Sequence, residues 1–289
     1  MKKVLMFAAI AAALVSFSSC KKDNGQTDDK SGKTEITVAK DALIAHFNFE
    51  GNAEDQVAGL KPKQEKAEYT AKRNGKALKG IAGGVLLYDV PADSKLKSAT
   101  SITIAMWLKQ APIPTSQAPV PCFFEFVAPD AFWGNFAMSI DRKGDEENPS
   151  DLLTPKVFGQ CIEGRDFWKT DGDAKLGVTG NRWNHIIYTY DAAKSEFHVY
   201  LNGADVTPED QIACTFGVGE EAVPDGNLDL TTTTQFIIGA WQNKVIGGAT
   251  DEWMGDFLGE MDELRIYDKA LTKDEAKTLY QGEVANLDE

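Results

Sequence analysis

The chain has 289 residues, with 30 Lys and Arg against 44 Asp and Glu and a formal net charge of −14. Nucleic acid is excluded as an expected partner, because its binding depends on Lys and Arg that neutralise phosphates. Apolar residues make up 43% of the sequence, enough for a substantial core, and we expect residues 36–289 to form one domain.

The first 20 residues have the parts of a secretory signal. Two lysines precede an apolar run over residues 4–15, and two serines stand directly before Cys20. The run is shorter than the roughly 20 apolar residues of a membrane-spanning helix. The ending 17–20 resembles the lipobox of bacterial lipoproteins, which implies removal of residues 1–19 and lipidation of Cys20. We therefore expect a membrane-anchored lipoprotein at the outer membrane or cell surface, with an ordinary signal peptide as the alternative.

Residues 20–35 are predicted to be the lipidated cysteine and a flexible tether. No apolar residue occurs from position 21 to position 33, so this segment lacks the surface that a fold must bury. Its Asp23, Asp28 and Asp29 resemble the acidic surface-export signals of Bacteroidota lipoproteins.

Most of the remaining chain alternates apolar and polar residues with a period of two, which is typical of strands. The predicted strands cover 43–49, 102–108, 122–127, 136–140, 157–162, 183–190, 197–201, 236–239 and 257–267. One helix is expected after residue 271, where Thr272 and Glu275 have the spacing of a capping box. This pattern predicts an all-β fold, a two-sheet antiparallel sandwich with one short C-terminal helix.

Four segments resemble the laminin-G-like, concanavalin A-like jelly-roll domains of bacterial surface proteins. They are 43–52, 101–107, 181–191 together with 199–203, and 259–271 with the helix that follows. The segments stand in the family's order across residues 42–282. The resemblance implies a jelly-roll sandwich in which Trp107 and Trp183 belong to the core, and it leaves the function open because one fold serves many functions.

The resemblance also implies a structural calcium ion between the opening and closing strands. Carried over by position, Glu50 and Asp262 are the candidate side-chain ligands. Carboxylate and carbonyl oxygens are the ligands that Ca²⁺ prefers. A solvated pair of carboxylates is the alternative.

Some relatives of this fold cleave glycosidic bonds with two carboxylates in one cleft. The nearest match here is Glu260 with Asp262, and Leu264 and Arg265 occupy the places where a second catalytic glutamate would stand. We therefore expect no enzyme, and a divergent glycoside hydrolase is the third functional alternative.

The spacing of the cysteines and histidines indicates neither a metal site nor a redox site. Cys122, Cys161 and Cys214 fit no zinc or redox pattern, so we predict structural thiols, with a Cys122–Cys161 disulfide as the alternative in an exported protein. His185 lies in one of the family's core segments and is predicted to be a hydrogen-bonded structural residue.

Four tryptophans outside the family's motifs lie in or beside segments rich in Gly, Asp and Asn. They are Trp133, Trp168, Trp241 and Trp253. Two of them follow a phenylalanine, beside Asp130 and Asp166. An aromatic ring with flanking polar groups can cover the C–H face of a sugar and hold its hydroxyls. We therefore predict a carbohydrate ligand, with a protein–protein or adhesive surface module as the runner-up and aromatic residues folded over the sandwich as the structural alternative.

Overall fold

The computed structural model describes residues 36–72, 75–110, 119–142, 152–169, 178–179, 182–217 and 219–286. The signal segment, Cys20 and the tether lie outside these residues, so lipidation and membrane anchoring stay predictions. None of the described helices has the length and apolar character that crossing a bilayer requires.

The first sheet has eight strands in the order β14-β13-β12-β6-β19-β4-β3, with β1 also paired to β19. Its strands are β1 (Leu43–Phe47), β3 (Glu68–Ala71), β4 (Lys76–Lys79), β6 (Ile102–Lys109), β12 (Asn184–Asp191), β13 (Glu196–Leu201), β14 (Ala204–Asp205) and β19 (Glu260–Tyr267). All the neighbouring pairs are antiparallel.

The second sheet has nine strands in the order β10-β9-β8-β7-β17-β5-β2, with β11 paired to β9 and β18 to β7. Its strands are β2 (Gln64–Lys66), β5 (Val85–Asp89), β7 (Val120–Val127), β8 (Phe136–Arg142), β9 (Leu152–Gln160), β10 (Asp166–Lys169), β11 (Val178–Thr179), β17 (Gln235–Ile238) and β18 (Met254–Gly255). Every pair is antiparallel except β18 with β7. Two further short strands, β15 (Thr215–Phe216) and β16 (Val223–Pro224), form a separate hairpin.

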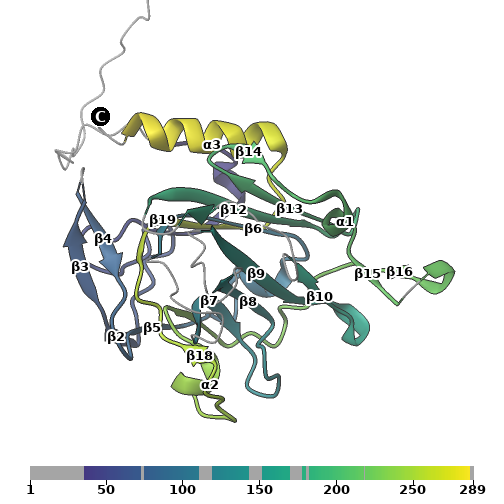
Figure 1. The fold of residues 1–289 in the computed structure, drawn as a ribbon, viewed down its shortest axis with the longest axis horizontal. Helices are drawn as coiled ribbons and strands as arrows, with labels where there is room; N and C mark the ends of the chain where they lie inside the picture. Colours follow the sequence, from purple (N-terminus) through teal and green to yellow (C-terminus); the bar gives the residue numbers. More distant parts are fainter. Residues whose placement is uncertain are drawn as a thin grey trace, which may run out of the picture. The chain divides into compact units, whose positions relative to one another are not determined.

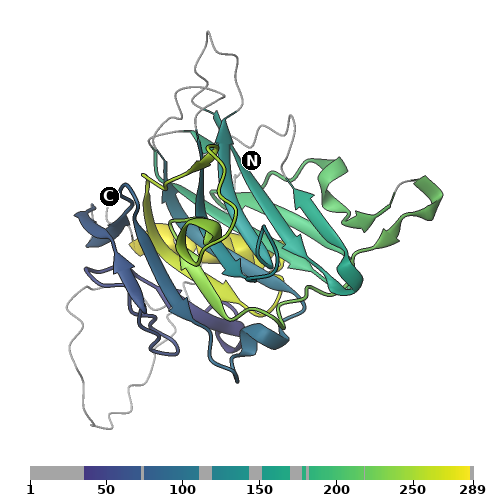
Figure 2. The same cartoon turned by 90° about the horizontal axis from the view of Figure 1, so that it is seen from below.

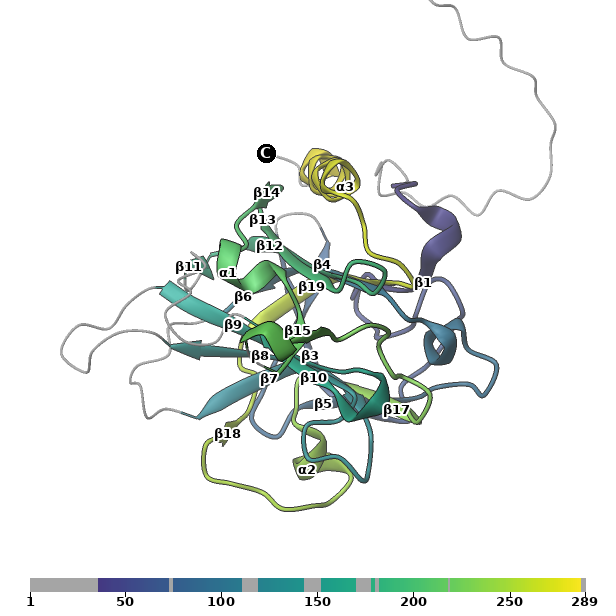
Figure 3. The same cartoon turned by 90° about the vertical axis from the view of Figure 1, so that its right-hand side faces the viewer.

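The two sheets face each other, with helices on their outer sides (Figures 1 and 3). The α-helices are α1 (Glu209–Ile212), α2 (Gln242–Val245) and α3 (Lys273–Asn286), and the 3₁₀ helices are η1 (Lys40–Ala42), η2 (Lys95–Ser98), η3 (Ile162–Gly164) and η4 (Gly219–Glu221). Helix α3 covers the outer face of the first sheet. The segment that contains α2 crosses the outer face of the second sheet (Figure 2).

The core lies between the sheets and is built by the predicted alternation. On β7, Phe124 and Phe126 point inward, and on β12 Ile186, Tyr188 and Tyr190 do the same from the facing sheet. All five are fully or almost fully buried, and burying each such side chain stabilises the fold by roughly 1.5–3 kcal/mol. The predicted all-β sandwich with one C-terminal helix is confirmed.

The predicted helix is confirmed together with its cap. The backbone N–H of Thr272 donates to Glu275 Oε2 at 2.8 Å, and the N–H of Glu275 donates to Thr272 Oγ1 at 3.3 Å. Its apolar side packs on the first sheet through Ala276 and Leu279. These reciprocal bonds fix where α3 begins.

Two local expectations were wrong. The closing strand begins at Glu260 rather than at residue 257. Trp183 lies just before β12 and is only half-buried, because the sheet pairing starts at Asn184. The predicted structural thiols are confirmed, because Cys122, Cys161 and Cys214 are buried free cysteines. The alternative, a Cys122–Cys161 disulfide, is not formed, and these two residues lie in different apolar clusters.

Candidate functional site

The outer face of the second sheet carries one continuous row of side chains across six strands. The strand registers place side by side Leu87, Ile237, Glu125, Ala137, Phe158 and Trp168, from β5 to β10. Residues that pair directly across strands share a face of the sheet. The row is therefore apolar throughout except at Glu125, and it ends at the β10 edge in two aromatic rings.

Six aromatic side chains gather at this end of the row, and we call them the aromatic cluster. They are Phe132, Trp133, Phe158, Trp168, Trp241 and Trp253. Trp133 is at the centre. Its ring centroid lies 4.9 Å from that of Trp168, 5.4 Å from that of Trp253 and 5.8 Å from that of Trp241. The four tryptophans predicted from the sequence are thus brought together by three separate segments of chain.

The cluster has a floor and an exposed rim. Trp241 is only 2% exposed, and its Nε1 donates to the carbonyl of Val120 at 2.8 Å, so it forms the floor. Trp168 and Phe132 are each 37% exposed, and Trp133 and Trp253 are half-buried. Rings that pack edge to face on their neighbours while one side meets solvent can stack on a ligand without first becoming ordered.

The loop that carries Phe132 and Trp133 is held down by one glutamine. Gln242 Oε1 accepts from the N–H of Ala128 at 3.0 Å, and its Nε2 donates to the carbonyls of Ala128 and Ala131. Gly134 ends the loop with a φ of 65°, where a side chain would strike the preceding strand. The two rings are therefore positioned by a fixed loop.

Glu125 supports this glutamine from below. Its Oε2 accepts from the backbone N–H of Gln242 at 2.6 Å, and the side chain is fully buried. Burial raises the pKa of Glu125 to about 8, because a charge at this depth loses its hydration. Glu125 and Gln242 give no signal in the sequence, because only the strand register and the path of the 239–255 segment place them beneath the loop.

The structure does not bring the two predicted calcium ligands into one oxygen cage. Asp262 is buried and forms an ion pair with Lys72, whereas Glu50 accepts from the backbone N–H of Lys76 at 2.8 Å near the surface. An ammonium group already supplies the charge that Ca²⁺ would bring to Asp262. Among the described residues, no group of three or more His, Cys, Asp or Glu side chains is arranged to hold a metal ion.

The carboxylates of the possible hydrolase motif are also paired. Glu260 lies 3.0 Å from the Nζ of Lys109, and Asp262 is engaged by Lys72. His185, predicted to be structural, is buried with its Nε2 3.0 Å from Glu283 Oε2. Burial lowers the pKa of His185 to about 3, so the ring is neutral at physiological pH.

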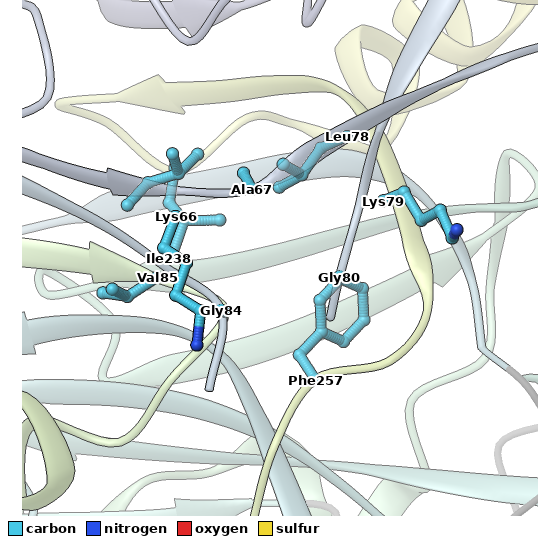
Figure 4. A pocket seen from close by; sticks show the side chains of 11 residues that line it. Lys66, Ala67, Leu78, Lys79, Gly80, Gly84, Val85, Ile238 and Phe257 are labelled. Atoms are coloured by element: carbon cyan, nitrogen blue, oxygen red, sulfur yellow. The ribbon is translucent and has the colours of Figure 1, made fainter. Parts of the chain in front are cut away.

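A small cavity lies at the side of the sandwich, between β4, β5 and the residues after β17 (Figure 4). Its volume is about 10 Å³, room for about one water molecule. Its lining residues are Lys66, Ala67, Leu78, Lys79, Gly80, Gly84, Val85, Leu86, Ile238, Gly239 and Phe257. This cavity is too small for a sugar, so the aromatic cluster is the better candidate site.

No protein-family model and no curated protein sequence matches this chain. Solved structures do match its fold. The chain is similar to the receptor-binding domain of a botulinum neurotoxin C/D mosaic serotype, with a TM-score of 0.54, 11% identity, and coverage of 84% of this chain and 52% of that one. What the two share is a two-sheet β-sandwich fold.

Two further solved structures have the same fold. One is the ligand-binding domain of botulinum neurotoxin serotype D in complex with N-acetylneuraminic acid, with a TM-score of 0.54, 11% identity, and coverage of 86% of this chain and 53% of that one. The other is a Trypanosoma rangeli sialidase, with a TM-score of 0.54, 15% identity, and coverage of 86% and 34%. The chain thus spans about half the length of the toxin chains, and the likeness establishes the fold alone.

Proposed function

We propose that this domain binds a glycan, and that the aromatic cluster is the binding surface. The observation that carries the proposal is the convergence of Trp133, Trp168 and Trp253 on one outer face, with Phe132 and Trp168 open to solvent. Aromatic faces cover the C–H surfaces of sugar rings, while polar groups at their edges take the hydroxyls. That a toxin domain of the same fold was crystallised with N-acetylneuraminic acid supports this reading.

We further propose that the protein works outside the cytoplasm, as a lipoprotein attached through Cys20. In the described domain, Ile36 packs beside Gly282 of α3, on the outer face of the first sheet. The aromatic cluster is on the outer face of the second sheet. The first described residue and the aromatic cluster thus lie on opposite outer faces of the sandwich.

Binding without catalysis is the activity that we propose. The ion pairs of Glu260 with Lys109 and of Asp262 with Lys72 support it, because a glycosidase needs one carboxyl group free to give a proton and another free to attack or activate water. Glu125, beneath the loop that carries Phe132 and Trp133, is also engaged, because its side chain is buried and accepts a hydrogen bond from the backbone N–H of Gln242.

The test is a glycan array probed with the domain that starts at residue 36, followed by calorimetric titration of each oligosaccharide that binds. Trp168→Ala should weaken binding about five- to tenfold, since one aromatic contact contributes roughly 1 to 1.4 kcal/mol. Val284→Ala is the matched control, because Val284 is 39% exposed on α3 at the opposite face. Binding that survives both Trp168→Ala and Phe132→Ala unchanged would place the site elsewhere, and a silent array would remove the proposal.

A further inference from the structure

We propose that the aromatic cluster selects glycans without negative charge and discriminates against anionic ones. This inference rests on the proposed function and deepens it, because it names the class of sugar. It is carried by the charges that surround the exposed rings. Four exposed carboxylates lie beside the cluster, and we call them the rim acids. They are Asp130, Asp166, Asp251 and Glu252.

Each rim acid has a defined position next to a ring of the aromatic cluster. Asp166 is two residues before Trp168 on β10, so both side chains are on the outer face, about 7 Å apart along the strand. Asp251 accepts from the Nε1 of Trp253 at 3.0 Å, and Glu252 is the residue between them. Asp130 is in the turn before Phe132, on the loop that Gln242 holds.

The positive charges near the cluster do not offset these carboxylates. Lys156 is two residues before Phe158 on β9, so both side chains are on the outer face of the second sheet, and Lys156 is half-buried. Lys244, on α2, is 2.5 Å from Asp256 and is therefore already neutralised. Among the described side chains around the cluster, acids thus outnumber cations. Arg and Lys are the groups that proteins use to bind carboxylates, phosphates and sulfates, and the rim offers acceptors in their place.

Acceptors of this kind suit a neutral sugar. Hydroxyl groups donate hydrogen bonds to ionised carboxylates, and these charge-assisted bonds are stronger than neutral ones. A ligand carboxylate or sulfate at the same place would meet like charge. With four carboxylates about 8 Å from one ligand charge, Coulomb repulsion in water weakens binding about tenfold at ~20 mM salt and about fourfold at ~150 mM.

The experiment compares glycans that share a backbone and differ only in charge. Methyl-esterified and de-esterified oligogalacturonate form one pair, and laminarin and sulfated laminarin form another. We expect the neutral member of a pair to bind about tenfold more tightly at low salt, with a smaller ratio at high salt. Asp166→Asn combined with Asp251→Asn should reduce the ratio about threefold, because half of the rim charge is gone while the acceptor for Trp253 remains. Asp274→Asn, which removes an exposed charge from α3 across the sandwich, should leave the ratio unchanged.

The outcomes separate the two proposals. Equal binding of both members at low salt, or tighter binding of the anionic member, would overturn the selectivity and leave glycan binding standing. An unchanged ratio in the double variant would show that the rim acids do not set it, which also overturns the inference. If neither member of either pair binds and the glycan array is silent, the proposed function fails and the selectivity falls with it.

Discussion

The indole Nε1 of Trp107 donates a 2.6 Å hydrogen bond to the carboxylate of Glu283, and both side chains are buried although 176 residues of sequence separate them. The same carboxylate pairs with Arg265 and lies 3.0 Å from the Nε2 of His185. Glu283 is on α3, whereas the other three residues are on β6, β12 and β19. One glutamate therefore anchors the C-terminal helix to three strands of the first sheet.

We expect Glu283→Ala to lower the free energy of unfolding by about 2–3 kcal/mol, because it leaves the Trp107 donor buried without a partner and removes one of the two carboxylates that pair with Arg265, the other being Glu263. Urea unfolding followed by tryptophan fluorescence measures the loss. Val284→Ala, one residue along the same helix and exposed, should change stability by less than about 0.5 kcal/mol. Equal midpoints for the two variants would contradict the anchoring role.

The buried carboxyl of Glu125 should make stability depend on pH. Its pKa is raised from 4.5 to about 8 in the folded protein, so between these values the folded chain holds a proton that the unfolded chain has lost. This contribution is complete below pH 4.5 and is lost as the pH rises through about 8. Relative to Glu125→Gln, the wild type should therefore lose about 1 kcal/mol per pH unit or less across that window.

Denaturant midpoints of both proteins at pH 5, 6, 7 and 8 measure this difference. The comparison with Glu125→Gln cancels the other titrating groups, such as His46, whose pKa is lowered chiefly by burial. A difference that does not vary with pH would show that the Glu125 carboxyl keeps its ordinary pKa.

Truncating Trp241 should mainly reduce stability, whereas truncating Trp168 should mainly reduce ligand affinity, although the sequence analysis selects both residues for the same reason. Trp241→Ala removes a ring that is 2% exposed and should lower stability by about 3–5 kcal/mol. Trp168→Ala removes a ring at the exposed edge, and we expect a loss of stability of about 1 kcal/mol with a larger proportional loss of ligand affinity. Thermal melts and titrations on the same two variants separate the floor of the cluster from its binding surface.

The ion pair of Lys72 with Asp262 predicts that calcium does not stabilise the domain. The melting temperature should be the same in EDTA and in millimolar CaCl₂. Lys72→Met should lower it under both conditions, because Asp262 would then be a buried charge without its partner. A melting temperature that falls with EDTA and recovers with Ca²⁺ would instead establish the calcium site that the family resemblance implies, since a ligand bound only by the folded state stabilises it.

The lipid anchor predicted at Cys20 is tested in the bacterial membrane. Metabolic labelling with a fatty-acid analogue should mark the wild-type protein, and Cys20→Ala should remain unprocessed or soluble and unlabelled. Cys122→Ala is the matched control, because Cys122 is a buried thiol in the folded domain. Equal labelling of wild type and Cys20→Ala would contradict the prediction that Cys20 carries the lipid.

The sequence by itself was sufficient for the fold class. The continuous apolar run along residues 102–108, the segment 184–190 rich in β-branched and aromatic residues, and the capping box at Thr272 are local patterns, and each favours a local structure whatever the rest of the chain does. Three of the strands that it missed show why local patterns can fail. β2 and β3 carry exposed polar residues and show little apolar alternation, and Val85–Tyr88 of β5 is apolar on both faces, so it has no period of two.

The tertiary structure alone decided which residues meet. The sequence selects Trp133, Trp168, Trp241 and Trp253 as residues outside the motifs, but their convergence depends on the pairing of β9 with β10 and on the segment that crosses from β17 to β18. Likewise, Asp262 has the position of a calcium ligand in the sequence, and only the folded chain brings Lys72 to it. Contacts between distant segments are set by hydrogen-bond register and loop path, and local residue patterns carry neither, because a shift of one residue reverses the face that every side chain occupies.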